Sequence, residues 1–178
     1  PACCLWFAID YDNNLWVYRE LYTQKITADI FARKVLDLES GEYIRYGVLD
    51  ASTWARRGDI GPSIAETMIQ AGCRWRPSDR TGRSRISGKL EIHKRLKIED
   101  KEPGIRIFSN CRNLLRTFPT LPLDDSNPED INTHVEDHAY DALRYGCTSR
   151  PMHTSYANKL YGSRNTSEFV PSDRVFGY

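Results

Sequence analysis

The chain has 178 residues, of which 40% are hydrophobic and 28% are charged, as is typical of a globular domain with a core of its own. It contains no run of 18 apolar residues, which argues against a membrane-spanning helix, and its five cysteines include no CxxC pair, which argues against a disulfide framework and a zinc site. The net charge of +1 is small, although basic and acidic residues are concentrated in different segments.

The N-terminal stretch "PACCLWFAIDYD" has no basic leader and begins directly with a strand-like pattern, so it does not resemble a signal peptide. The sequence also starts without Met and within that pattern, and we interpret it as a domain excised from a longer protein. Because unpaired cysteines suit a reducing compartment, we expect a cytoplasmic location.

The first predicted elements are two strands joined as a hairpin. Residues 3–10 and 15–21 have the apolar and aromatic content of strands. Asn13 and Asn14 lie between them and tolerate the positive φ that a tight turn requires.

Three further segments predict a helix, a buried strand and a second helix, at residues 27–40, 43–52 and 63–72. Thr27 can cap the first helix, and the strand carries Asp50 at its end. Ser63 and Glu66 have the spacing of a capping box, and Gly72 is a typical helix stop.

The remaining pattern begins with a basic loop in residues 76–85 and ends in a helix that contains the stretch "EDHAYDALRYG". Between them the sequence predicts a basic amphipathic helix at residues 86–98, a strand at 105–109, a helix that ends at prolines at 111–122, and an acidic loop at 123–134. The final helix occupies residues 136–147.

This alternation of strands and helices predicts an α/β fold with a mixed central β-sheet flanked by helices, to which the hairpin contributes an antiparallel part. Residues 1–148 form the predicted domain. From residue 149 to 178 the sequence is polar without sustained periodicity, and we interpret it as a C-terminal tail or linker.

The charged residues divide into a basic and an acidic segment. Between Arg74 and Lys97 there are nine Lys or Arg and only two acidic residues, whereas between Leu123 and Asp141 there are seven Asp or Glu and no Lys or Arg. A basic lobe beside an acidic pocket is what a metal-dependent enzyme acting on a polyanion needs. Two separate solvated patches are the alternative interpretation.

Asp50 ends a predicted buried strand, a position that ligand sites in α/β sheets favour. A structural role is also consistent with the sequence, because a strand-end Asp can form an Asx-turn with Ser52.

Asp141 lies inside a predicted helix among residues that are expected to be buried. An unpaired buried carboxylate is costly, and a bound cation would offset that cost. The alternative is an ordinary ion pair with Arg144 three residues later. His138 lies three residues before Asp141 and is a candidate metal ligand or proton carrier, and Asp137 is a candidate ligand, outer-shell group or helix cap.

These residues together favour phosphodiester hydrolysis assisted by two divalent cations. Mg²⁺ and Mn²⁺ prefer oxygen ligands, which Asp50, Asp137 and Asp141 offer. The basic segment would contact the phosphates of the substrate. The residues predicted to contact these phosphates are Arg80, Arg83, Arg85 and Lys89.

Several motifs, in the same order, resemble the C-terminal nuclease domain of the large terminase subunit of tailed bacteriophages. The similar segments are "PACCLWFAIDYDNNLWVYRELY", "YGVLDAS", "SIAETMIQAG", "RISGKLEIHKRLKI", "CRNLLRTF" and "EDHAYDALRYG". The last resembles the family signature "DHAxDALRYa" and is the most specific. The resemblance covers about residues 1–148 and implies an RNase H-like (integrase-like) fold.

The resemblance further implies a metal-dependent endonuclease that cuts concatemeric viral double-stranded DNA during genome packaging, in the cytoplasm of the infected bacterial host. Asp50 matches the second metal-binding Asp of the family and Asp141 the third, whereas His138 matches a residue present in some members and Asp137 an acidic position of varying role. The first Asp of the family precedes the Pro that corresponds to Pro1, so it is missing from this sequence together with the start of that strand. The full-length protein would also contain an ATPase domain and would bind the portal and the small terminase subunit.

Asp10 and Asp12 are not interpreted as replacements for the missing carboxylate, because both fall at the hairpin turn. Two other function classes are consistent with the sequence. One is a DNA-binding module of the same fold without cleavage activity, and the other is a resolvase or transposase of the RNase H-like superfamily. A preference for branched DNA would distinguish the last class.

Overall fold

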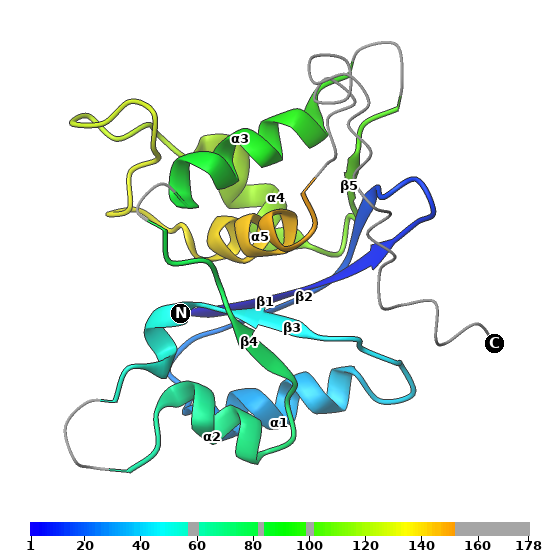
Figure 1. Cartoon of the computed structure of the whole chain (residues 1–178), viewed down its shortest axis with the longest axis vertical. Coiled ribbons are helices and arrows are strands. Elements are labelled where there is room, and N and C mark those ends of the chain that lie inside the picture. Colours follow the sequence, from blue (N-terminus) through cyan, green and yellow to red (C-terminus); the bar gives the residue numbers. More distant parts are fainter. Residues whose placement is uncertain (57–60, 82–83, 99–101, 152–178) are drawn as a thin grey trace, which may run out of the picture.

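The computed structural model describes residues 1–56, 61–81, 84–98 and 102–151 of the chain (Figure 1). Arg83 and residues 152–178, which make up most of the predicted tail, lie outside the described residues. The elements in chain order are β1 (Ala2–Ile9), β2 (Leu15–Thr23), α1 (Ala28–Leu38), β3 (Gly47–Leu49), the 3₁₀ helix η1 (Ala51–Trp54), α2 (Ile64–Gln70), β4 (Trp75–Pro77), α3 (Ser84–Leu96), β5 (Ile105–Ile107), α4 (Arg112–Thr117), the 3₁₀ helix η2 (Phe118–Thr120) and α5 (His138–Ser149).

The predicted hairpin is confirmed as the antiparallel pair β1 and β2. Asn13 adopts a φ of 62° at the turn, a conformation that Asn tolerates better than most residues. The carboxylate of Asp10 accepts hydrogen bonds from the backbone N–H groups of Asp12 and Asn14 and from the indole N–H of Trp16. Asp10 is therefore a turn-forming residue, as the sequence pattern indicated.

The strands form two sheets. β5 pairs with β2 in parallel, which makes a mixed three-stranded sheet with the order β1-β2-β5. β3 and β4 form a separate parallel pair. The prediction of a mixed α/β fold with helices flanking a mixed sheet is confirmed in this general form.

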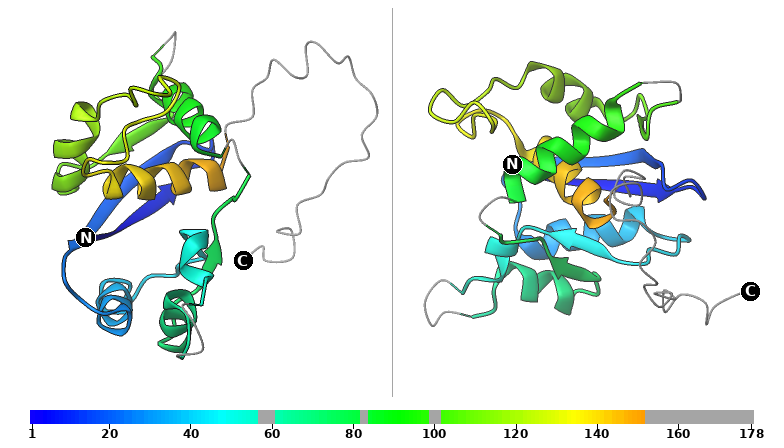
Figure 2. Two further views of the ribbon diagram at one scale, coloured as in Figure 1. Left: turned by 90° about the vertical axis from the view of Figure 1, so that its left-hand side faces the viewer. Right: turned by 45° about the horizontal axis from the view of Figure 1, so that its top comes forward.

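Helices cover both faces of β1, with α5 and α3 on one side and α1 and α2 on the other (Figures 1 and 2). Side chains of a strand alternate between faces, so successive residues of β1 reach different cores. Leu5 and Phe7 join the cluster that contains Leu143 of α5, while Cys4 and Trp6 join the cluster around Phe31 of α1. β1 is thus the strand that the two cores share.

Three details of the predicted secondary structure were wrong. The segment 76–85 is not entirely a loop, because it begins within β4, and α3 starts at Ser84, two residues before its predicted start. The strand predicted over residues 43–52 is reduced to Gly47–Leu49, the three residues that pair with β4.

The helix ends show which capping signals were effective. The Ser63–Glu66 capping box of α2 is formed in both directions, and Gly72 follows with a φ of 115°. Thr27 occupies the N-cap position of α1, but its hydroxyl donates to the Asp29 carboxylate instead of capping a backbone N–H. Among the described residues, no helix is both long and apolar enough to cross a bilayer.

Candidate active site

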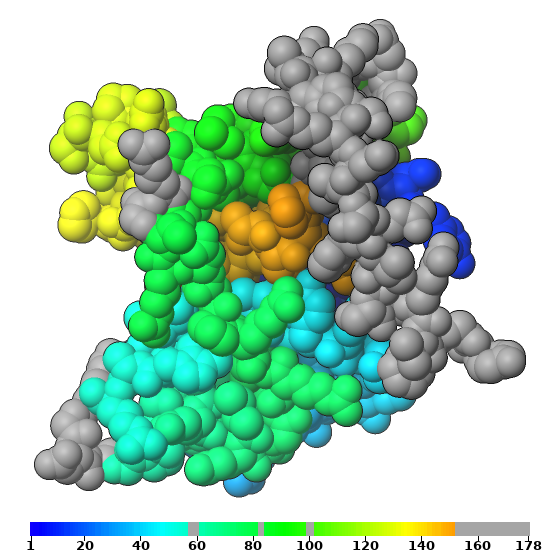
Figure 3. All heavy atoms as spheres, viewed as in Figure 1, coloured from blue at the N-terminus to red at the C-terminus, as the bar shows by residue number. Residues whose placement is uncertain are grey.

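A cavity of about 1190 Å³ lies between β1, β3, α1 and α5. Its wall includes Asp50, His138 and Asp141, which are the three residues predicted to be catalytic. In the space-filling view, part of α5 (orange) is visible between α3 (green) and the region of β3 (cyan) (Figure 3). The fold therefore brings Asp50 together with two residues that lie 88 and 91 positions further along the sequence.

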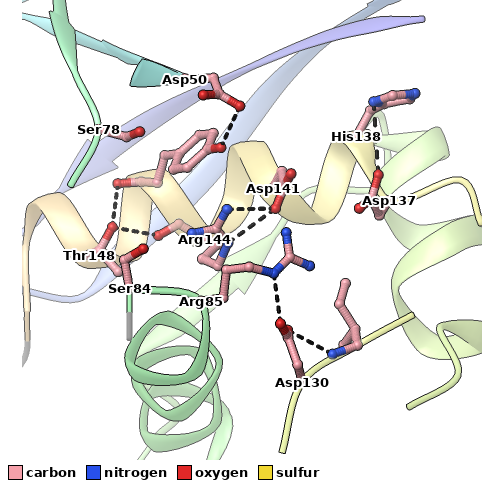
Figure 4. Close-up of polar contacts among 12 residues, drawn as sticks. Asp50, Ser78, Ser84, Arg85, Asp130, Asp137, His138, Asp141, Arg144 and Thr148 are labelled. Atoms are coloured by element: carbon pink, nitrogen blue, oxygen red, sulfur yellow. Dashed lines mark hydrogen bonds and ion pairs between the residues drawn. The ribbon is translucent and has the colours of Figure 1, made fainter. Parts of the chain in front are cut away.

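Asp50 follows β3 directly and has two sets of partners. One carboxylate oxygen accepts the backbone N–H of Ser52 at 2.7 Å, which caps η1, and the other accepts the hydroxyl of Tyr145 at 3.0 Å (Figure 4). Burial opposes ionisation of this carboxyl group, but the hydrogen bonds from Ser52 and Tyr145 and the charge of Arg144 outweigh it and lower the pKa. The Asx-turn expected from the sequence is present, and the ionised carboxylate also lines the cavity.

Asp141 lies in the first turns of α5 and is half-buried. One of its oxygens accepts from Arg144 at 2.8 Å and 3.1 Å, the ion pair that was the alternative interpretation of this residue (Figure 4). Arg144 is buried, and its stem lies against Gly88 of α3, where a Cβ atom would come within 2.5 Å of the Arg144 Cγ. Close packing of α3 on α5 therefore holds the guanidinium beside Asp141.

Asp137 and His138 form the beginning of α5. Asp137 is the N-cap residue, is buried, and makes no capping hydrogen bond through its side chain. Burial, together with the negative charge of Asp141, raises the pKa of Asp137. The Nδ1 atom of His138 lies 3.9 Å from the Asp137 carboxylate, and the imidazole is partly exposed at the cavity wall.

The donor set for a cation consists of carboxylates from two elements. Among the described residues, no group of three or more His, Cys, Asp or Glu side chains is arranged to hold a metal ion. Asp50 and Asp141 nevertheless offer hard oxygen donors on one cavity, and Mg²⁺ is commonly held by one or two carboxylates together with water and substrate phosphates. The residues present therefore fit a cation that binds jointly with a phosphate-bearing substrate.

Three of the four residues predicted to bind DNA belong to the described part of the chain, and each of them has a partner there. Arg85 of α3 pairs with Asp130 at 2.8 Å, and Lys89 donates to the backbone carbonyls of Pro128 and Glu129. Arg80 donates to the carbonyl of Ala51 next to Asp50. The basic helix and the acidic loop thus contact each other, which means that part of the positive charge is already compensated within the fold.

Sequence reasoning missed that two arginines gather around Tyr46, which lies with Arg150 on the cavity wall. The guanidinium of Arg76, on β4, lies 3.5 Å from the ring centre of Tyr46, and the Nε of Arg150 donates to the Tyr46 hydroxyl at 3.2 Å. Burial opposes ionisation of Tyr46, but a hydrogen bond from Ser149 and the charges of Arg150 and Arg76 outweigh it and lower its pKa. These residues are separated by up to 104 positions, so only the fold could show their grouping.

Two other carboxylates have structural roles. Glu20 accepts the backbone N–H groups of Asn113 and Leu114 and thereby caps α4 from a neighbouring strand. Glu136 pairs with Arg116 and accepts the hydroxyl of Tyr22, and the bond with Arg116 is the main reason that its pKa falls to about 2. Neither is part of the cavity wall that Asp50 and Asp141 share.

Comparison of the chain with models of protein families, with curated proteins and with solved structures gave no match. The resemblance to terminase nuclease domains therefore depends on the sequence motifs alone, and the RNase H-like fold, the activity and the partners that it implies stay predictions. The structure itself is mixed α/β, with a mixed three-stranded sheet and helices on both of its faces.

Proposed function

We propose that the chain is the nuclease domain of a viral genome-packaging motor, with an RNase H-like fold, and that it cleaves concatemeric double-stranded DNA by phosphodiester hydrolysis with two Mg²⁺ or Mn²⁺ ions. The observation that carries this proposal is the convergence of Asp50 and Asp141 on one cavity, from a strand end and from a helix. In the full-length protein the domain acts with an ATPase domain, the portal and the small terminase subunit, in the cytoplasm of the infected bacterium.

The site residues have distinct roles in this proposal. Asp50 and Asp141 bind the cations, and Tyr145 orients Asp50 through its hydroxyl. Bound divalent cations supply an activated water and stabilise the leaving oxygen. Arg144 donates to one oxygen of Asp141 and fixes its position, and the other oxygen is the one that would contact a ligand. His138 and Asp137 lie one helical turn before Asp141 and can accept or release a proton near the site.

The basic residues near the cavity suit contacts with phosphates. Arg76 and Arg150 flank Tyr46 at the rim, and Arg80 lies next to Asp50 through its bond to Ala51. Arg85 and Lys89, which the sequence also assigned to DNA, would first have to exchange their partners in the acidic loop. We therefore assign the larger share of DNA contact to the arginines at the rim.

A second candidate function is DNA binding without cleavage. It is favoured by two observations, the ion pair between Asp141 and Arg144 and the lack of a three-ligand group among the described residues. In this case the carboxylates are structural partners of Tyr145 and Arg144, and the basic rim alone contacts the duplex.

Binding of Mn²⁺ and nicking of a supercoiled plasmid test the first proposal. A chain extended upstream of Pro1, which restores the first carboxylate that the resemblance implies, is compared with its Asp50→Asn and Asp141→Asn variants in Mg²⁺, Mn²⁺ and EDTA. We expect calorimetric Mn²⁺ binding and metal-dependent nicking, with each variant reduced by about 100-fold or more, because altering even an outer-shell partner of a metal costs 10–100-fold. Asp37→Asn is the matched control, since Asp37 is exposed on α1, outside the cavity wall.

The outcomes separate the candidate functions. Nicking that survives in EDTA, or Mn²⁺ binding that both variants retain in full, would overturn the metal-dependent nuclease. Binding of linear duplex without cleavage under every condition would favour the second function. Selective cutting of a four-way junction would instead point to a resolvase.

A further inference from the structure

Arg85 of α3 lies near three carboxylates and donates a hydrogen bond to one of them. Its Nε donates to Asp130 at 2.8 Å, and Figure 4 shows the guanidinium between Asp130 and the carboxylates of Asp137 and Asp141. Burial opposes its charge, but the bond with Asp130 and the negative charges of Asp130, Asp141 and Asp137 outweigh it and raise the pKa of Arg85. The Nη2 atom of Arg85 is buried and has no hydrogen-bond partner among the described residues. An unpaired buried donor is costly, so the observed position of Arg85 depends on its bond to Asp130.

The helix that carries Arg85 gives its charge no support. Arg85 is the second residue of α3, and the first turn of this helix contains no acidic residue. The N-terminus of a helix has a partial positive charge, which disfavours a cation there. The side chains of Arg85 and Asp130 are 33% and 16% exposed, so water screens their attraction only in part. The surrounding carboxylates therefore decide where the guanidinium lies.

Asp130 is held in place by contacts other than its bond with Arg85. Its second carboxylate oxygen accepts the backbone N–H of Ile131 at 2.8 Å, and Ile131 is buried in the larger core. Lys89, one turn after Arg85 on α3, donates to the backbone carbonyls of the two loop residues that precede Asp130. The acidic loop is thus anchored at both sides of Asp130, and this carboxylate is a fixed point to which Arg85 is attached.

The carboxylates of α5 are the other groups that attract Arg85. Asp137 is buried and makes no capping hydrogen bond through its side chain. Both hydrogen bonds from Arg144 to Asp141 end on the same carboxylate oxygen. Two carboxylates thus face the single guanidinium of Arg144, and this excess of negative charge would attract a divalent cation. A second guanidinium beside them would cancel the excess and remove that attraction.

We propose that Asp130 is a positioning residue for the metal site, which holds Arg85 away from Asp137 and Asp141 and so keeps these carboxylates open to a divalent cation. This inference rests on the proposed function, since the cation concerned is the one that Asp50 and Asp141 would bind. When Asp130 is removed, Arg85 moves to the carboxylates of α5 and competes with the cation for them. If the pair of Arg85 and Asp130 is purely structural, its removal weakens the fold but creates no competitor.

Calorimetric titration with Mn²⁺ provides the first test, in the extended chain of the cleavage experiment. We expect Asp130→Asn to weaken Mn²⁺ binding by about tenfold or more, as is typical of changes just outside a metal site. A double variant, Asp130→Asn with Arg85→Met, should regain the affinity of the parent chain, because the competing guanidinium is gone. Asp125→Asn is the matched control, since it removes the same charge from an exposed position in the same loop. A purely structural role of Asp130 does not explain recovery in the double variant.

Crystal structures of the chain and of its Asp130→Asn variant without metal provide a second test, which does not depend on metal binding. We expect Arg85 at Asp130 in the first structure, and within about 3.5 Å of the Asp137 or Asp141 carboxylate in the second. Arg85→Met alone covers the case in which Asp130→Asn does not fold. It should tighten Mn²⁺ binding by about threefold or more, because a positive charge near the cation is removed.

The outcomes separate this inference from the proposed function. The inference is overturned if Arg85 keeps its place in Asp130→Asn, if the double variant binds Mn²⁺ as weakly as Asp130→Asn does, or if Asp125→Asn has an equal effect. Unchanged or weaker binding by Arg85→Met would also contradict it. An extended chain that takes up no Mn²⁺ counts against the proposed function instead, and the two crystal structures still decide where Arg85 lies.

Discussion

The two sides of β1 differ in how completely they are built. On the α5 side, a cluster of twelve buried residues joins the three-stranded sheet to α3, α4 and α5. On the α1 side, the buried cluster has six residues, and β3 and β4 pair over only three residues each. On the α5 side, the strands and helices share one continuous core. On the α1 side, the elements depend more on local features such as helix caps and on packing against β1.

The candidate site spans both sides. Asp141 belongs to α5 and Asp50 follows β3, so their relative position depends on the junction of the two cores. The hydrogen bond from Tyr145 to Asp50 crosses that junction directly, over 95 positions of sequence. A site of this kind is lost either when its supporting core is weakened or when the smaller side shifts against the larger one.

The largest effect is expected from weakening the α5 side. Leu143 is fully buried in the larger cluster, so Leu143→Ala removes contacts and leaves a cavity. We expect a loss of about 2–5 kcal/mol in the free energy of unfolding, measured by urea denaturation. Leu90→Ala on α3 is the control, since Leu90 is 55% exposed. Equal losses in the two variants would contradict the buried position of Leu143 in the larger cluster.

A smaller effect is expected from a local signal on the α1 side. Ser63→Ala removes the side-chain oxygen that caps α2 and should cost about 1 kcal/mol. Thr27→Ala is the matched control, because Thr27 is also an N-cap residue but its hydroxyl does not bond to the backbone of α1. Chemical denaturation of both variants gives the comparison, and a cost at Thr27 as large as that at Ser63 would show that the cap bond is not the cause.

The sequence was sufficient for features that depend on neighbouring residues. The hairpin turn at Asn13, the capping box at Ser63 and the pairing of Asp141 with Arg144 all involve residues at most four positions apart, and each was among the predictions or their stated alternatives. Side-chain preference and helical spacing decide such features before the chain folds.

Features that depend on distant residues were not predictable in the same way. β4 was missed because a strand of three residues that contains Arg76 and Pro77 and follows Arg74 gives no strand pattern without knowledge of β3. The Tyr145–Asp50 bond was missed because a Tyr in an apolar helix looks like packing until the opposite wall is known. Pairing of Arg85 with Asp130 was likewise not evident from two oppositely charged segments alone.

The smallest predicted effect concerns Asp137, at the start of α5. Burial first, and then the charge of Asp141, raises its pKa in the folded chain above the ordinary value near 3.9, while His138 and Arg85 act in the opposite direction. The folded chain therefore binds this proton more tightly than the unfolded chain does. Asp137 consequently imposes no penalty below the ordinary pKa, and a penalty develops as pH rises through the window between the ordinary and the raised values.

Asp137→Asn removes this penalty and keeps a residue that suits an N-cap. We expect the variant to unfold at a higher urea concentration than wild type at pH 7, by less than the cost of losing the Ser63 cap, and to match wild type near pH 3. Asp125→Asn, in the exposed acidic loop, is the matched control variant. A gain that is constant across pH would mean that ionisation of Asp137 is not its cause. A loss at pH 7 would mean that the Asp137 carboxylate is favourably paired in the folded chain, and that charge interactions stabilise this end of α5 in addition to the packing of the larger core.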